Sequence, residues 1–183
     1  MADTTFLIQL GDRFPGDLHV EMNLRERLAG RVLGQQDLLD RYGDGLYSTD
    51  IAVRLDLLRR ALADLAPGPV VLVGRSSGSR VATLATLAPE GAAVRAVICL
   101  GYPFRAPGQP VEDGRVGHLA GLATPTLIFQ GRRDVYGGET VTRDYVLSPA
   151  VRVELLDAEH SMKLAPEVWD DVVARIGAFV AEA

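Results

Sequence analysis

Short apolar runs alternate along the chain with stretches in which apolar residues recur every three or four positions. The runs are typical of buried strands, and the recurrence is typical of helices with one apolar face. A strand that is apolar throughout is covered on both sides, so the alternation predicts a parallel sheet between two layers of helices. The five runs comprise residues 4–10, 70–73, 94–100, 126–130 and 151–156.

Three stretches have the spacing of an amphipathic helix. The first begins near Ser48 or Thr49 and stops at Pro67, because proline does not continue a helix. The second surrounds Val81, and the third begins at Pro166 near the C-terminus. The first two lie between predicted strands and the third follows the last one, as the helices of a parallel sheet do.

A single domain over residues 1–183 accommodates all of these elements. The chain is 183 residues long, enough for one substantial core but too short for two ordinary domains. A weaker sixth strand is expected within residues 31–39, and the proline-rich segment 102–110 is expected to be a loop inside the domain. We therefore predict an α/β fold, a compact three-layer α/β/α sandwich with a mostly parallel central sheet of about six strands, in which Trp169 belongs to the core.

Composition restricts the function classes. Hydrophobic residues make up 48% of the chain and charged residues 23%, and the net charge is −5 with no basic run. These values are typical of a soluble globular protein and disfavour nucleic acid as a partner. No apolar run reaches the roughly 18 residues of a membrane span, and the first run lacks the cationic segment of a signal peptide, so we expect a cytoplasmic protein without a membrane partner. Cys99, the only cysteine, lies in an apolar run and is expected to be a buried structural thiol.

Residues 74–78, Gly-Arg-Ser-Ser-Gly, match the G-x-S-x-G pattern of a serine nucleophile. They stand between the run 70–73 and the helix around Val81, and such a motif requires this succession of strand, turn and helix. Glycines two residues before and after the serine leave room for neighbouring backbone on a strained turn. We therefore predict that Ser76 is the nucleophile and that the amide of Ser77, at the start of the helix, stabilises an oxyanion.

A glycine-rich turn of a nucleotide-binding fold is the alternative interpretation of this motif. The phosphate-binding pattern G-x-x-x-x-G-K-[ST] does not occur, and Ser76 stands where the dinucleotide pattern G-x-G-x-x-G has its second glycine. A Rossmann-like module that binds a small molecule is therefore disfavoured.

A serine nucleophile needs a general base, which is usually histidine, and the chain has three histidines. His19 lies far before the nucleophile, and His118 lies in a short segment, 115–122, for which we expect a structural role. His160 lies in the loop after the run 151–156, at the carboxyl end of a strand, where open parallel sheets carry their active sites. We predict that His160 is the base.

The acid that orients the base should also lie at the carboxyl end of a strand. Asp134 follows the run 126–130 and meets this condition, although aspartate is also a common turn residue. Asp157, three residues before His160, is the rival, and we expect it to cap its own strand. We predict that Asp134 orients the imidazole.

Four arginines fall in loops at the predicted carboxyl edge of the sheet. A cluster of guanidinium groups there would favour acyl substrates that carry a carboxylate or a phosphate. The alternative is that they are solvated surface charges. The four are Arg75, Arg105, Arg132 and Arg133.

The chain order Ser76, Asp134, His160, each after a successive strand, resembles that of the α/β-hydrolase superfamily. Two stretches, Gly-Arg-Ser-Ser-Gly-Ser-Arg-Val-Ala from Gly74 and Cys-Leu-Gly-Tyr-Pro-Phe from Cys99, resemble its small members without a lid, often labelled dienelactone-hydrolase-like. The resemblance extends from residue 70 to the C-terminus and covers the first 65 residues poorly. It implies a hydrolase without a metal or organic cofactor. Dienelactone hydrolases themselves use a cysteine nucleophile, so their particular activity is not implied.

The superfamily usually has a His-Gly stretch after its first central strand, which supplies a second oxyanion amide. This chain has Leu10, Gly11, Asp12 and Arg13 at that place. The resemblance implies that Gly11 fills the glycine position and that Asp12 or Arg13 donates the amide. A carboxylate beside an oxyanion is unfavourable unless it points away, so the Asp12 side chain is expected to do so.

These residues together predict a serine hydrolase that cleaves small carboxylic esters or thioesters through an acyl-enzyme on Ser76. Only about 25 residues separate Leu100 from Thr126, too few for an independent lid domain, so we expect an open, shallow site that favours short acyl groups. The alternative is a non-catalytic binding or scaffold protein on the same fold, because a fold alone does not establish activity.

Overall fold

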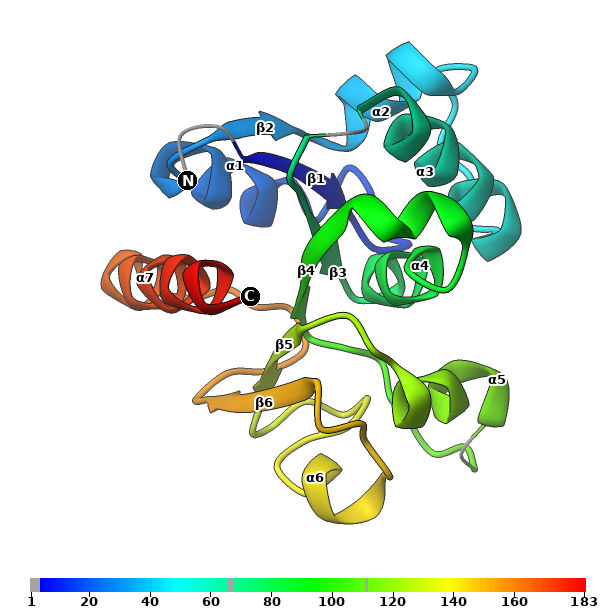
Figure 1. Ribbon diagram of the computed structural model, residues 1–183. Helices are drawn as coiled ribbons and strands as arrows, with labels where there is room; N and C mark the ends of the chain where they lie inside the picture. Colours follow the sequence, from blue (N-terminus) through cyan, green and yellow to red (C-terminus); the bar gives the residue numbers. More distant parts are fainter. Residues whose placement is uncertain (1–3, 66–67, 111) are drawn as a thin grey trace.

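The computed structural model describes residues 4–65, 68–110 and 112–183 (Figure 1). Within these residues six strands form one sheet, in the order β2-β1-β3-β4-β5-β6, and every neighbouring pair is parallel. The five predicted runs and the parallel sheet are confirmed. The strands are β1 (Thr5–Gln9), β2 (Arg31–Leu33), β3 (Val70–Arg75), β4 (Val94–Leu100), β5 (Thr126–Gly131) and β6 (Val151–Leu156).

Helices cover both faces of the sheet, so the predicted three-layer sandwich is confirmed (Figure 1). One face carries α1 (Leu18–Arg27) and α7 (Pro166–Glu182), and the other carries α2 (Gln35–Tyr42), α3 (Ile51–Leu65) and α4 (Ser77–Ala85). The shorter helical segments are η1 (Pro89–Ala93), α5 (Asp113–Val116), η2 (Gly117–Gly121) and α6 (Val141–Asp144). None of the helices in the described residues is long and apolar enough to cross a membrane.

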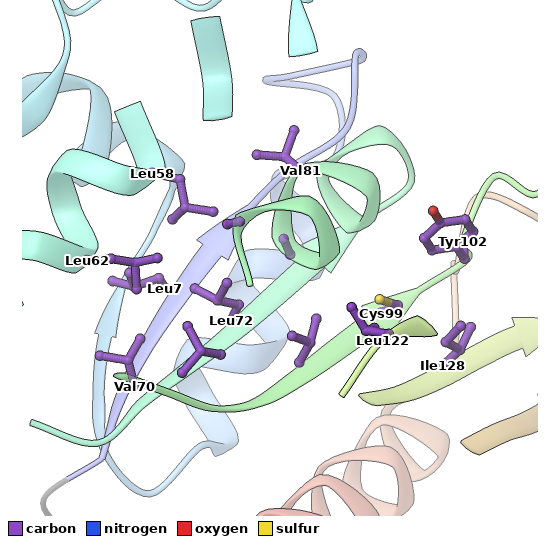
Figure 2. Packing of buried hydrophobic residues seen from close by; sticks show 14 of the residues in the cluster. Leu7, Leu58, Leu62, Val70, Leu72, Val81, Cys99, Tyr102, Leu122 and Ile128 are labelled. Carbon is purple, nitrogen blue, oxygen red and sulfur yellow. The ribbon is translucent and has the colours of Figure 1, made fainter. Parts of the chain in front are cut away.

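Alternate residues of each central strand enter two separate cores, because successive side chains of a strand point to opposite faces. Leu72 of β3 packs under α3 and α4 in the cluster of Figure 2, whereas its neighbour Val73 packs on the side of α1 and α7. Trp169 is fully buried in the second core, and Cys99 is fully buried in the first. Both predicted core positions are confirmed.

The first predicted helix begins slightly later than expected. The Asp50 carboxylate accepts the amide of Ala52 at 2.7 Å and caps the first turn of α3, while Ser48 accepts the amide of Asp50 at 3.1 Å. The predicted stop at Pro67 lies outside the described residues. The start of α7 at Pro166 is confirmed.

The sixth strand expected within residues 31–39 is confirmed as β2, but it is short. Only Arg31–Leu33 pairs with β1, and α2 begins at Gln35. The reason lies in α1, a helix that the sequence pattern did not predict. Glu21 of α1 is buried and accepts the amide of Gln35 at 2.9 Å, while Asp37 accepts the amide of Gly34 at 2.8 Å. Two carboxylates thus hold the free amides at the start of α2 and end the strand.

Candidate active site

Ser76 occupies the turn between β3 and α4 in a backbone conformation that residues with a side chain rarely adopt, with φ of 52° and ψ of −123°. The two glycines of the motif make this turn possible. A Cβ atom on Gly74 would overlap the backbone of Ser79, and one on Gly78 would overlap the carbonyl group of Gln9. The predicted strand, strained turn and helix are therefore present, and they place Ser76 at the carboxyl edge of the sheet.

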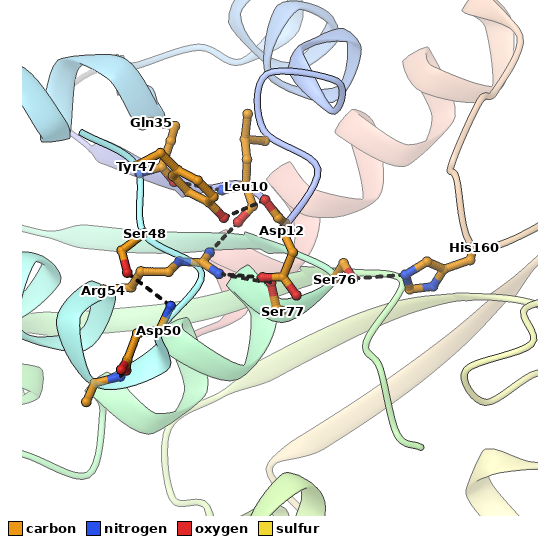
Figure 3. A network of polar contacts seen from close by, with 12 residues as sticks. Leu10, Asp12, Gln35, Tyr47, Ser48, Asp50, Arg54, Ser76, Ser77 and His160 are labelled. Atoms are coloured by element: carbon orange, nitrogen blue, oxygen red, sulfur yellow. Dashed lines mark hydrogen bonds and ion pairs between the residues drawn. The ribbon is translucent and has the colours of Figure 1, made fainter. Parts of the chain in front are cut away.

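Three side chains form a continuous chain of hydrogen bonds at this edge. The Oγ atom of Ser76 lies 2.9 Å from Nε2 of His160. On the other side of the ring, Nδ1 of His160 lies 2.8 Å from Oδ2 of Asp134. The structure thus brings together the three residues that the sequence predicts as nucleophile, base and acid; Figure 3 shows the contact between Ser76 and His160.

Asp134 is a buried carboxylate held by three N–H groups. Besides His160, the side chain of Gln130 donates to Oδ2 at 2.8 Å, and the amide of Tyr136 donates to Oδ1 at 2.8 Å. The Asp134 side chain has no exposed surface, whereas the ring of His160 is 18% exposed. An ionised carboxylate only accepts, so it requires the hydrogen of the imidazole on Nδ1 and leaves Nε2 as an acceptor for the hydroxyl of Ser76.

Tyr136 also stacks on the imidazole, with ring centroids 4.1 Å apart and the planes tilted by 31°. The sequence pattern alone does not identify this residue. Its position two residues after Asp134, in the loop predicted to lie at the site, was the available signal. Tyr136 thus fixes the carboxylate through its backbone and covers one face of His160 with its side chain.

Arg75 contacts the ring of His160 and is almost fully buried. One of its terminal nitrogens is 3.4 Å from Nε2 of His160, and the other is 3.9 Å from Oδ1 of the buried Asp17. Burial lowers the pKa of Arg75, and the negative charge of Asp17 opposes that shift. Because a guanidinium group only donates, Arg75 also favours the form of His160 in which Nε2 carries no hydrogen.

The loop after β1 lies close to Ser76. A Cβ atom on Gly11 would lie 3.1 Å from the Cβ of Ser76, so the glycine allows the close approach. The backbone amide of Asp12 has no acceptor among the described residues, and the first amides of a helix, such as that of Ser77 in α4, are also free. The sequence predicts that the amide of Ser77, together with that of Asp12 or Arg13, stabilises an oxyanion, and the amide of Arg13 likewise has no acceptor among the described residues.

The carboxylate of Asp12 is turned toward α3 and α4 (Figure 3). It accepts the hydroxyl of Ser77 at 2.5 Å and lies 3.3 Å from Arg54, which is only 3% exposed. Arg54 also donates to Ser77 at 2.9 Å and to the carbonyl oxygen of Leu10. The negative charge of Asp12 is thus compensated by Arg54. Burial lowers the pKa of Arg54, while Tyr47 and Asp12 act in the opposite direction.

Neither Arg54 nor Tyr47 emerged from the sequence. Tyr47 donates its hydroxyl to the carbonyl oxygen of Gly11 at 2.5 Å, and burial raises its pKa to about 12. Arg54 offered one signal, because it lies three residues after Ile51 and four before Leu58, in line with the apolar face of the predicted helix. A cation in such a position is buried, and a buried cation requires acceptors.

The rival residues lie elsewhere. Asp157 is exposed and pairs with Arg133, and so it does not contact His160. His118 lies 2.9 Å from the hydroxyl of Thr83, and burial lowers its pKa, in keeping with the structural role expected for it. His19 borders the site and lies 3.1 Å from the carbonyl oxygen of Ser161.

A cleft of about 780 Å³ opens over Ser76 and His160. Arg75 and Arg133 belong to its lining, but Arg105 and Arg132 do not, and Arg132 instead lies 3.5 Å from Glu139. The structure therefore brings two of the four predicted arginines to the site. The other cationic side chains of the lining, which the sequence analysis did not select, are Arg13, Arg80, Arg115 and Lys163. In the part of the chain that the structure describes, no group of three or more His, Cys, Asp or Glu side chains is placed to hold a metal ion.

A serine on a strained turn, with a histidine and a carboxylate at the ends of later parallel strands, has the arrangement of an α/β hydrolase. Residues 50–175 match the model of the family described as the alpha/beta hydrolase domain. The match covers more than half of the chain, and the protein belongs to this family.

Solved structures share the fold at low sequence identity. An esterase from Exiguobacterium antarcticum aligns with a TM-score of 0.70 at 13% identity, covering 97% of this chain and 92% of that chain. An esterase from Pyrococcus furiosus aligns with a TM-score of 0.60 at 16% identity, covering 99% and 82%. An α/β hydrolase from a lagoon-sediment metagenome in Morocco aligns with a TM-score of 0.66 at 20% identity, covering 96% and 90%. No curated protein matches the chain.

Proposed function

We propose that this α/β hydrolase cleaves small carboxylic esters or thioesters through an acyl-enzyme on Ser76. The observation that carries the proposal is the unbroken hydrogen-bonded series from Ser76 through His160 to the buried Asp134. Two of the solved structures with the same fold are esterases, which favours an ester bond as the point of attack.

In the proposed reaction, Nε2 of His160 accepts the hydroxyl proton as Oγ of Ser76 attacks the acyl carbon. The new oxyanion is held by the amides of Ser77 and Asp12. His160 then returns the proton to the leaving oxygen or sulfur, and water repeats the sequence to release the acid. Asp134 stabilises the imidazolium that forms in each half of the reaction.

Arg75 contacts the ring that carries the proton. Its guanidinium group lies 3.4 Å from Nε2 of His160 and helps to fix the position of the ring. The buried Asp17 balances part of the guanidinium charge at 3.9 Å.

Covalent labelling tests the proposal. A fluorophosphonate should form an adduct located at Ser76 by mass spectrometry, and the Ser76→Ala variant should form none. Esterase activity on p-nitrophenyl acetate and butyrate should disappear in the same variant. Because the described residues between β4 and β5 form only the short segments α5 and η2, we expect an open cleft for which p-nitrophenyl palmitate is the poorer substrate.

A non-catalytic binding or scaffold protein on this fold predicts a different result. The folded wild-type protein would then show no adduct under conditions in which an ordinary serine esterase is labelled fully. Labelling at a residue other than Ser76 would also contradict the proposal, because it would place the reactive hydroxyl outside the hydrogen-bonded series.

A further inference from the structure

Arg80 is a cation inside the cleft without a polar partner. It lies on α4 three residues after Ser77, on the same side of the helix, and both residues line the cleft. The Arg80 guanidinium group makes no hydrogen bond and no ion pair with any residue that the structure describes, and its Nε atom is buried. The buried Nε has lost water without gaining an acceptor, and the terminal nitrogens make no bond to a described residue, so the group is free to bind a ligand in the cleft.

Arg115 places a second guanidinium group in the lining of the same cleft. One of its terminal nitrogens donates to the exposed Glu112 at 3.1 Å, but its Nε atom is buried and has no acceptor among the described residues. The backbone of Arg115 is fixed by Tyr102, whose hydroxyl donates to its carbonyl oxygen at 2.7 Å. The two arginines are near enough that the charge of Arg115, together with burial, lowers the pKa of Arg80.

The nearby carboxylates pair with other cations and leave Arg80 without an ion pair among the described residues. The two acids that act on Arg80 are Glu112 and Asp12. Glu112 is bonded to Arg115, and Asp12 is bonded to Ser77 and lies against Arg54. Over its whole lining the cleft has six cationic side chains and three carboxylates, in a chain whose net charge is −5. Arg115 and Arg133 pair with acids outside the lining, Glu112 and Asp157, whereas Arg80 has no such partner among the described residues.

We propose that Arg80 and Arg115 form an anion subsite of the cleft, which binds a carboxylate or phosphate group carried by the substrate. The proposal rests on the hydrolase function proposed above and narrows it to esters with a negative charge. Arginine suits this role because its planar fork binds either group through two parallel hydrogen bonds. Arg80 follows Ser76 by about one helical turn, roughly 5.4 Å, so an anion a few atoms from the scissile bond can reach it.

Two esters of matched length test the subsite. The wild-type protein should have a higher kcat/KM for the p-nitrophenyl ester of succinate, which is anionic, than for that of butyrate, which is neutral. The Arg80→Gln variant should lower the ratio of these two values roughly 10- to 100-fold, the usual loss for a hydrogen bond to a charged group. Arg115→Gln should lower it in the same direction and serves as a second variant if Arg80→Gln fails to fold.

Arg132→Gln is the matched control, because Arg132 lies outside the cleft lining and its charge pairs with Glu139. This variant should leave the ratio unchanged. Raising the salt concentration should reduce the preference of the wild-type protein for the succinate ester, since salt screens the attraction. An equal ratio in the wild-type, Arg80→Gln and Arg115→Gln proteins would overturn the proposal.

A binding measurement separates this proposal from the hydrolase function. Ser76→Ala cannot form the acyl-enzyme but retains both arginines, so calorimetric titration with succinate and, separately, with inorganic phosphate measures the subsite alone. In the double variant Ser76→Ala, Arg80→Gln, the affinity for these anions should be lower by about tenfold or more. Binding that depends on Arg80 would support the subsite even if no ester were hydrolysed. Absence of binding of both anions would overturn it even if neutral esters were cleaved.

Discussion

The groups on the two sides of Ser76 are held in place by different kinds of contact. On one side, the carboxylate that orients His160 is held by groups of its own loop and strand, namely Gln130 and Tyr136, within four residues of Asp134. On the other side, the loop after β1 is held by Arg54 and Tyr47, which lie 36 to 44 residues away in sequence. The Asp134 carboxylate is thus fixed locally, whereas the loop after β1 depends on tertiary packing.

The two sides also differ in how they compensate buried charge. Asp134 is an anion enclosed by three N–H donors. Arg54 is a cation that is almost fully buried, and its acceptors are one carbonyl oxygen, one hydroxyl and the half-exposed carboxylate of Asp12. Its Nε atom is buried without an acceptor. The charge of Arg54 is less completely compensated than that of Asp134. We therefore expect substitution of Arg54 to lower the free energy of unfolding more, and substitution of Asp134 to lower kcat more.

The largest effect is expected from Asp134→Asn. The two oxygens of Asp134 accept hydrogen bonds from three N–H groups, whereas asparagine has only one oxygen. The NH2 group of the asparagine must therefore face at least one of these N–H donors. The hydrogen on Nδ1 of His160 is then no longer favoured, and kcat should fall by roughly four orders of magnitude, as in the serine-protease template. Ester hydrolysis measured over a range of pH checks this.

Asp157→Asn is the matched control for that substitution. Asp157 is exposed and pairs only with Arg133, so kcat should remain within about twofold of the wild-type value. Near-normal activity of Asp134→Asn together with loss of activity in Asp157→Asn would transfer the role of acid to Asp157.

Arg54→Met should affect both stability and catalysis. It removes the donor to Leu10, Ser77 and Asp12, which should lower the free energy of unfolding by about 1–3 kcal/mol. Displacement of the loop should lower kcat/KM by roughly 10- to 100-fold, because small errors in the position of an oxyanion donor are costly. Urea unfolding and the ester assay measure the two effects.

Arg60→Met serves as its control, since Arg60 lies on the same helix and makes an exposed pair with Asp56. Its effects on stability should stay within about 0.5 kcal/mol. If Arg54→Met is no more damaging than Arg60→Met, the loop is not held from α3.

The smallest effect is expected from Tyr47→Phe, which removes only the hydroxyl bonded to Gly11. A loss of about 1 kcal/mol in stability is expected, and Tyr42→Phe, whose hydroxyl contacts the exposed Asp64, should lose less. Burial raises the pKa of Tyr47 to about 12, so the neutral hydroxyl stabilises the folded protein. This contribution is complete below pH 10, the ordinary pKa of tyrosine, and is lost as the pH rises through about 12.

A steeper loss of stability in the wild-type protein than in Tyr47→Phe between pH 10 and 12 is therefore expected in thermal unfolding experiments. Parallel curves for the two proteins would show that the hydroxyl does not titrate as a buried group.

The sequence predicted what depends on chain order and on local patterns. Five strands, the motif around Ser76 and the positions of Asp134 and His160 after their strands all follow from apolar runs and the polar residues that end them. Because the strands are parallel, their carboxyl ends meet at one edge, and chain order alone brings the three residues together.

The pattern failed where distant groups decide the local structure. Helix α1 buries only Val20 and Leu24 as apolar side chains, too few for a clear periodic signal, and Glu21 is buried among them. That carboxylate helps to start α2 at Gln35 and so limits the sixth strand to Arg31–Leu33. The sequence did not identify Arg54 or Arg80 for the same reason. Arg54 matters because the fold brings acceptors to it, and Arg80 matters because the fold brings none from the described residues.

Cys99, the single thiol of the protein, lies in β4 and can report how often the central sheet opens. Burial raises the pKa of Cys99 from 9.0 to about 12, and the side chain has no exposed surface. In the native protein at neutral pH, an alkylating reagent cannot reach Cys99, and the thiol is not ionised. Modification proceeds only from molecules in which the central strands have separated, and so its rate, followed by mass, reports how often the middle of the sheet opens.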